Sequence, residues 1–170
     1  MMHKLTAGLI ALAVFFSLPA LAQKPGAEPR IRTQTDKGFA LFLASGASEL
    51  QRQIEFCYAS ASGAFNDPKA IGAAVERELA NERCLALDHL GLILFIAQKR
   101  MMETRFKKPF DDPFFNPEAE EKRVAQHLER QNFDETQKKK FSDFVFSVVY
   151  DEFKRLSSTS KESTATPTSK

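Results

Sequence analysis

The sequence predicts an all-α protein, a single-domain bundle of roughly four to six helices around one central apolar helix. Two observations predict this class. Apolar residues recur at spacings of three, four or seven along most of the chain, which is the period of a helix face. No stretch of useful length alternates apolar and polar residues as a strand would, and the chain has neither an internal repeat nor an Asn-Gly hairpin turn. We expect the folded domain to span residues 36–156.

Residues 1–22 have the organisation of a secretory signal peptide. Lys4 gives the leading segment a positive charge, the next segment is mostly apolar, and Ala20-Leu21-Ala22 has the form of a cleavage site. The apolar stretch, about 14 residues long, is shorter than the roughly 20 residues that a membrane-spanning helix needs. We therefore expect cleavage after Ala22, a periplasmic or secreted protein, and no stable membrane insertion of the mature chain.

The net charge argues against one class of partner. The whole chain carries a formal net charge of +2, and loss of Lys4 with the signal peptide would lower this value by one unit. A chain so close to neutral has little electrostatic attraction for a polyanion, so we expect no nucleic-acid partner. The length that remains after cleavage suits one domain.

Two segments beside the predicted domain lack the pattern of a helix. Residues 23–35 combine Pro, Gly and charged residues without apolar periodicity, so we expect a flexible N-terminal lead. Residues 157–170 are almost entirely Ser, Thr, Lys, Ala and Pro. They have no apolar face to bury, and we expect a disordered C-terminal tail.

The first part of the domain predicts one or two helices. An apolar stripe in residues 39–65 has the spacing of a helix face and could belong to one long helix. Alternatively, residues 45–47 could interrupt it, because Ser48 and Gln51 have the form of a capping box that starts a new helix. Both arrangements are open from the sequence.

A short helix and the central helix should follow. Asp67 before Pro68 has the form of a helix start, and we expect a short helix from there to about residue 79. From Cys84 to about Arg105 the sequence leaves almost no polar face. Since a helix that is apolar all round is normally enclosed by others, this segment should form the centre of the core. Its apolar residues are Leu85, Leu87, Leu90, Leu92, Ile93, Leu94, Phe95 and Ile96.

The second half of the domain predicts a loop and two more helices. Residues 107–117 contain three prolines and should form the main internal loop. Asn116-Pro117 then repeats the pattern of a cap followed by proline, which predicts the start of a charged outer helix. Asp134 with Gln137 has the form of a capping box and predicts the start of the last helix.

The two cysteines of the predicted mature chain, Cys57 and Cys84, indicate a disulfide bond. An even number of cysteines in an exported protein favours a bridge over free thiols. The bridge would join the end of an early helix to the head of the central one. Two reduced buried cysteines or a bond between chains are the alternatives.

Two features are candidates for a partner-binding surface. The first is the loop that contains Phe110, Asp111, Asp112, Phe114 and Phe115, where aromatic rings and acids lie on a proline-stiffened segment. Alternatively, these rings pack onto the core, which burial favours by roughly 2–3 kcal/mol for each ring. The second is the last helix, whose apolar residues spread over about 240° where a surface helix needs roughly 100°. Enclosure, a partner or a homodimer face would each explain that spread.

The side chains needed for catalysis or metal binding are scarce. His89 has only apolar residues three or four positions away, and those around His127 are no better as ligands. We therefore predict no metal site, no cofactor and no catalytic residues, and expect both histidines to be structural or surface residues. His89 could be a buried residue bonded to a carbonyl or a carboxylate.

These observations favour an exported, non-enzymatic helical protein that acts by binding another protein, as inhibitors, immunity proteins, chaperones and accessory subunits do. The first alternative is a helical carrier of an apolar small molecule, with phenylalanines around a cavity. The second is an enzyme, whose site would have to be assembled from distant helices and could include Asp88, His89 and an acid from elsewhere in the chain.

Overall fold

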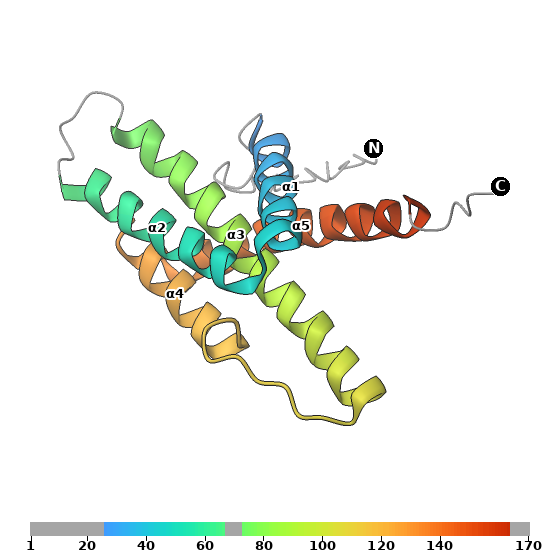
Figure 1. Cartoon of the computed structure of the whole chain (residues 1–170). Coiled ribbons are helices and arrows are strands. Elements are labelled where there is room, and N and C mark those ends of the chain that lie inside the picture. Colours follow the sequence, from blue (N-terminus) through green and yellow to red (C-terminus); the bar gives the residue numbers. More distant parts are fainter. Residues whose placement is uncertain (1–25, 67–72, 164–170) are drawn as a thin grey trace, which may run out of the picture.

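A computed structural model describes residues 26–66 and 73–163 (Figure 1). The predicted signal peptide, residues 1–22, lies outside the described residues. Within them the protein is all-α, as predicted, and has no strand. Its elements are α1 (Ala27–Ser45), α2 (Ala47–Asn66), α3 (Ala73–Met101), a π-helical turn η2 (Met102–Phe106), α4 (Pro117–Glu129) and α5 (Glu135–Ser163).

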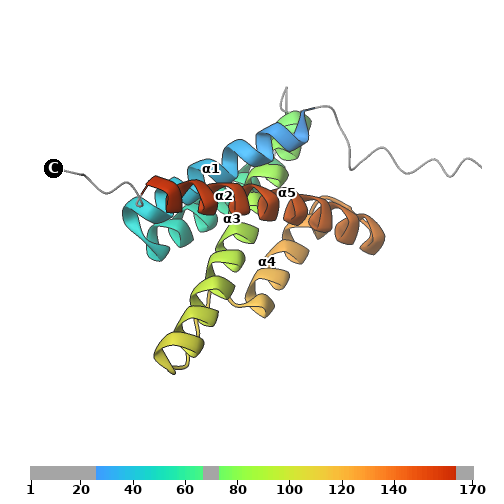
Figure 2. The ribbon, with the colours of Figure 1, turned by 90° about the vertical axis from the view of Figure 1, so that its right-hand side faces the viewer.

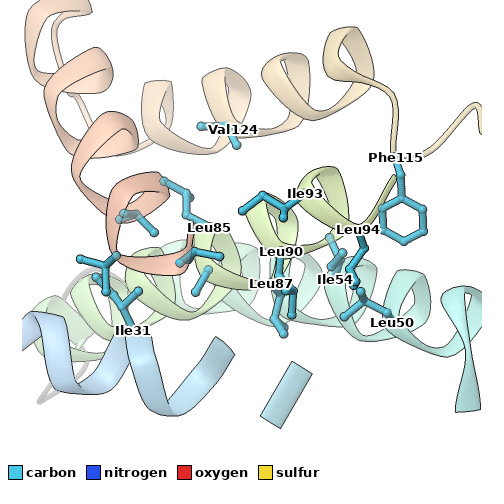
Figure 3. Close-up of a cluster of buried hydrophobic side chains, with 14 of the residues drawn as sticks. Ile31, Leu50, Ile54, Leu85, Leu87, Leu90, Ile93, Leu94, Phe115 and Val124 are labelled. Atoms are coloured by element: carbon cyan, nitrogen blue, oxygen red, sulfur yellow. The ribbon is translucent and has the colours of Figure 1, made fainter. Parts of the chain in front are cut away.

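Helix α3 runs through the middle of the bundle, and α1, α2, α4 and α5 pack against it (Figure 1). Helix α5 crosses α3 and also packs along α1. The central part of α3, from Cys84 to Phe95, is the centre of the core, as predicted. Figure 3 shows Leu87 and Leu90 of this helix near Ile54 of α2, and Val124 of α4 above the opposite side. None of the described helices is long and apolar enough to cross a membrane.

The prediction of a flexible lead over residues 23–35 is wrong from Ala27 onward. Helix α1 begins there, and Ile31 and Thr35 are completely buried. Pro29 is tolerated because the backbone N–H groups of a first helical turn have no partner within the helix.

Two arginines of this segment form ion pairs with distant helices. Their charges are part of the reason why the sequence resembles a flexible lead. Arg30 binds Glu82 of α3 at 2.6 Å, and Arg32 binds Glu152 of α5 at 2.9 Å. Both glutamates are buried. These contacts, together with the buried face of α1, explain why a polar segment is ordered here.

The predicted disordered tail is wrong for its first half. Helix α5 continues through residues 157–163, and the hydroxyls of Ser158 and Thr159 donate hydrogen bonds to carbonyls of their own helix one turn earlier. Residues 164–170 lie outside the described part of the chain.

The apolar stripe of residues 39–65 is divided between two helices. Gly46 separates α1 from α2 with a φ of 82°, a left-handed conformation that glycine adopts without steric cost, and its N–H donates to the carbonyl of Phe42. Of the two arrangements left open by the sequence, the one with a break is therefore observed, although α2 begins at Ala47 rather than at Ser48.

The short helix and the central helix, expected as two, are one continuous helix from Ala73 onward. The start predicted at Asp67 and Pro68 lies outside the described residues. The central helix also ends earlier than predicted, since α3 stops at Met101 and a π-helical turn replaces its last residues. The loop after it and both later helix starts are confirmed.

Those two starts have the hydrogen bonds that their sequences predict. The side chain of Asn116 accepts a hydrogen bond of 2.9 Å from the N–H of Ala119, and Pro117 begins α4. Asp134 and Gln137 exchange two bonds, of 2.8 and 3.0 Å, between side chain and backbone N–H. This reciprocal pair is a capping box.

The disulfide bond predicted from the cysteine count is present. Cys57 of α2 and Cys84 of α3 are bonded, and their Cα atoms lie 5.5 Å apart. The two cysteines are 27 positions apart in the sequence. The bond therefore fixes α2 and α3 to each other near the middle of each helix.

Candidate functional site

The aromatic rings of the predicted partner-binding loop pack inward. Phe115 is 4% exposed and lies against Gly91 of α3, where an added Cβ would overlap its ring. Phe110 and Phe114 are half-buried, with the ring of Phe110 5.6 Å from that of Phe95. The alternative in which these rings join the core is therefore the one observed.

The two acids of that loop differ in role. The carboxylate of Asp112 accepts hydrogen bonds from the N–H groups of Phe114 and Phe115, so it shapes the turn before α4. Asp111 is exposed. A partner-binding role for the loop stays a prediction, but its aromatic rings pack against the core.

Arg123 of α4 holds this loop and three helices together. Its guanidinium donates two hydrogen bonds to the carboxylate of Asp88 on α3, at 2.6 and 3.0 Å, and Tyr58 of α2 donates a third. Arg123 also donates to the carbonyl of Phe114 at 2.7 Å and lies over the ring of that residue. We call these four residues the Arg123 clamp.

The clamp contains one charge pair, formed by Asp88 and Arg123. The side chain of Asp88 is 0% exposed. Burial raises the pKa of Asp88, and the hydrogen bonds and charge of Arg123 oppose that shift. Burial likewise raises the pKa of Tyr58, which keeps its hydroxyl protonated and able to donate. Such a pair specifies one packing of α2, α3 and α4.

His89 is the second buried polar centre, and its imidazole lies against a carboxylate, although neither contacting atom has a hydrogen-bond partner. Its Nδ1 contacts Oε1 of Glu120 on α4, and Oγ of Ser142 on α5 lies 3.3 Å from its Nε2. Phe146 of α5 packs edge-on against the imidazole. The structure thus unites His89 with an acid from a distant helix, whereas Asp88 binds Arg123 instead.

His127 lies in a third polar cluster between α3 and α4. Its Nε2 is 2.8 Å from Oδ1 of Asn81, and Gln131 completes the cluster. Burial, with a smaller effect from the charge of Arg130, lowers the pKa of His127 to about 4. The imidazole is therefore neutral in the folded protein at pH values where it would be charged in the unfolded chain.

This shift predicts a loss of stability in mild acid. Between pH 6.5 and pH 4 the unfolded chain takes up a proton at His127 that the folded protein does not, so the free energy of unfolding falls as the pH falls. From pH 7 to pH 5 the contribution is about 2 kcal/mol. Urea unfolding at both pH values should show this loss in the natural protein and its absence in His127→Gln. Equal pH dependence of the two proteins would contradict it.

The last helix is mostly enclosed. Phe141, Val145, Val148 and Val149 are buried, and of its large apolar residues Tyr150 is the one described as strongly exposed. Burial of these residues accounts for most of the wide apolar arc on the part of α5 whose side chains the structure describes.

Of the six large apolar residues described as exposed, three lie at the far end of α3, and the others are Leu43, Phe56 and Tyr150. From Ile96 to Pro109 every side chain except those of Gln98 and Met102 is exposed. We call these fourteen residues, 96–109, the arm. Figure 2 shows that it extends beyond the other helices, with α4 returning toward the bundle beside it. Ile96 is 48% exposed, Met101 42% and Phe106 56%.

The arm is also strongly basic. It contains five basic residues and one acid, a formal charge of +4, so the rest of the chain carries −2 of the total of +2. Its basic residues are Lys99, Arg100, Arg105, Lys107 and Lys108. Among the described residues, Lys99 is the only one of the five with a carboxylate at ion-pair distance, that of Glu103 at 4.0 Å.

The backbone at the tip of the arm is irregular. The turn η2 has π-helical hydrogen bonding, which is rare in proteins and frequent at functional sites. Lys107 after it has a φ of 54°, in the left-handed region that few residues other than glycine adopt. One signal of this arm in the sequence is the change from apolar to charged residues after Ala97.

The described residues contain no group of three side chains that could hold a metal ion. Comparisons with models of protein families, with curated proteins and with solved structures found no match to this chain.

Proposed function

We propose that this is an exported protein that acts by binding another protein, and that the arm is its contact element. The observation that carries the proposal is the arm itself: three large apolar side chains and five basic ones exposed on a projecting helix end. Apolar anchors surrounded by charges are typical of protein-binding sites. A signal-like N-terminus and a disulfide bond support export.

The charge of the arm specifies the chemistry of the partner. Arg100, Arg105, Lys107 and Lys108 have no carboxylate at ion-pair distance within the described part of the chain. An acidic surface or cleft on the partner would supply those carboxylates and accept Phe106 and Met101 into apolar pockets. The partner is therefore expected to be an acidic protein.

The base of the arm is built to hold it in one position. The Arg123 clamp fixes the loop that returns from the arm, and Phe115 is buried against α3 at Gly91. A rigid arm loses little conformational entropy when it binds, which favours affinity.

The space among the phenylalanines of the core gives little support to the carrier alternative. The space enclosed among Phe42, Leu50, Leu94 and Phe115 is about 10 Å³, which is at the lower limit for a single water molecule. An apolar ligand would need several hundred cubic ångströms.

Site-specific crosslinking in the native cells tests the proposal. A photo-reactive amino acid is placed at Phe106 in the arm and, as a matched control, at Phe56 of α2, which is 68% exposed. We expect one acidic protein to be crosslinked at position 106 and not at position 56. The adduct should disappear in Lys107→Glu/Lys108→Glu and persist in Lys37→Glu/Lys122→Glu, which changes the charge equally on α1 and α4.

Three results would count against this function. Equal crosslinking at both positions would show that the arm has no special role. Adducts with phospholipid would indicate a membrane surface in place of a protein. Adducts with a second copy of the chain alone would indicate self-association through the arm.

A further inference from the structure

The exposed side chains of the arm do not share one face of the helix. Residues 96–101 end α3, and all of them are exposed except Gln98, which is half-buried. Each residue of an α-helix is rotated by about 100° from the one before it, so Ile96 and Met101 point in directions about 140° apart. Lys99 lies on the other side of Ile96, about 60° from it. The exposed arc from Lys99 through Ile96 to Met101 is therefore about 200° wide.

The remaining side of the arm is covered by the protein's own chain. Gln98 is on that side and lines the same small cavity as Asp112 and Phe115, which belong to the loop that returns from the arm. Met102, one turn after Gln98, is half-buried as well. The arm therefore has one covered side and a wide free side, and α4 lies next to it (Figure 2).

A flat protein surface could not contact the whole of the free side. A helix that lies on a flat surface buries an arc of roughly 100°. Such a surface would cover either Ile96 or Met101 and would leave the other in water. Both side chains are about half exposed, 48% for Ile96 and 42% for Met101, so the protein's own packing does not bury either of them fully.

We propose that the arm is inserted into a concave, acidic cleft of its partner, whose walls contact both sides of the exposed arc. The inference rests on the proposed function, in which the arm binds an acidic protein. Insertion buries Ile96 and Met101 at the same time, against different walls. It also brings carboxylates of those walls to Lys99 and Arg100.

The dimensions of the arm determine those of the cleft. A helix with its side chains is about 10–12 Å across, so the cleft must be at least about 10 Å wide. Ile96 and Met101 are about 7.5 Å apart along the helix axis, which gives the smallest depth that covers both. Because the returning loop covers the side of Gln98, the cleft must be open on that side. We therefore expect a groove or an open pocket rather than a closed tunnel.

Short-range photo-crosslinking from both sides of the arm tests the insertion. A diazirine analogue of lysine is placed at Lys99 or a diazirine analogue of methionine at Met101, so each position keeps the character of its native side chain. The two positions point about 160° apart around the helix. The methionine analogue at Phe56 of α2, which is 68% exposed, is the control. We expect the same acidic protein to be crosslinked from both arm positions and not from position 56.

The dissociation constant of the complex gives a second measurement. Ile96→Gln and Met101→Gln each remove an apolar side chain without a change of charge, and Leu43→Gln does the same on α1, where Leu43 is 63% exposed. Each arm variant should raise the Kd at least about tenfold, and the control less than about twofold. Since all three side chains are exposed, thermal unfolding should show that the variants fold as the natural protein does.

The outcomes separate the insertion from the proposed function. If position 106 and only one of positions 99 and 101 give adducts, or if only one of the two arm variants weakens the complex, the arm binds a flat surface and the insertion is overturned. Arm-mediated binding would then still stand. Absence of adducts from every arm position would overturn both.

Discussion

Replacement of Arg123 by methionine is expected to lower the free energy of unfolding by about 3–5 kcal/mol. The change leaves the carboxylate of Asp88, which is 0% exposed, without its cation. It also removes the donor to the carbonyl of Phe114. Urea unfolding measures the loss.

Two controls separate the buried charge from the lost packing. The double variant Asp88→Leu/Arg123→Met should recover most of the stability, because no unpaired charge remains. Arg52→Met removes an arginine from an exposed pair with Glu49 and should leave the urea midpoint unchanged. A single variant as stable as the natural protein would contradict the role of the clamp.

The pH dependence of Arg123→Met gives a further signature. Burial raises the pKa of Asp88, and without Arg123 nothing of equal strength opposes that shift. A raised pKa in the folded state favours folding below the unfolded pKa of the group and disfavours it as the pH rises through the folded value. The deficit relative to the natural protein should therefore be smaller in acid than at pH 7.

Removal of the disulfide bond is expected to cost about 3.5 kcal/mol, because the bond closes a segment of 27 residues. The double variant Cys57→Ala/Cys84→Ala should unfold at a lower urea concentration than the natural protein. The natural protein treated with reductant should move toward the same midpoint.

Alanine is the suitable replacement because Cys84 is completely buried, and alanine brings no polar group into that site. Thiol titration of the untreated protein should give no free thiol. Two reactive thiols per chain, or a double variant of undiminished stability, would contradict the predicted contribution of the bond.

The features that could be predicted from the sequence are those that depend on neighbouring residues. The starts of α4 and α5 follow from Asn116-Pro117 and from Asp134 with Gln137, since each cap is closed within three residues. The disulfide followed from there being two cysteines in the predicted mature chain.

The features that were missed or left open concern residues whose partners are distant in sequence. Helix α1 looked like a lead because Arg30 and Arg32 have their partners on α3 and α5. His89 has apolar neighbours on its own helix, while its polar contacts come from α4 and α5. The one available signal was a histidine within an otherwise apolar segment, where a buried imidazole needs a partner.

The arm was not predicted, because the whole central helix, as far as about Arg105, was expected to be buried in the core. Packing partners cover α3 only as far as Phe95, and beyond that residue Ile96, Met101 and Phe106 are exposed. An apolar residue indicates burial only where another element is present to cover it.

The most direct test of arm-mediated binding is the dissociation constant of the complex with the crosslinked partner. Lys107→Glu/Lys108→Glu should weaken the complex at least about tenfold, because two attractive charge contacts become repulsive. Lys37→Glu/Lys122→Glu should change the constant less than about twofold. If both double variants bind as tightly as the natural protein, or are weakened equally, the arm is not the element that binds an acidic partner.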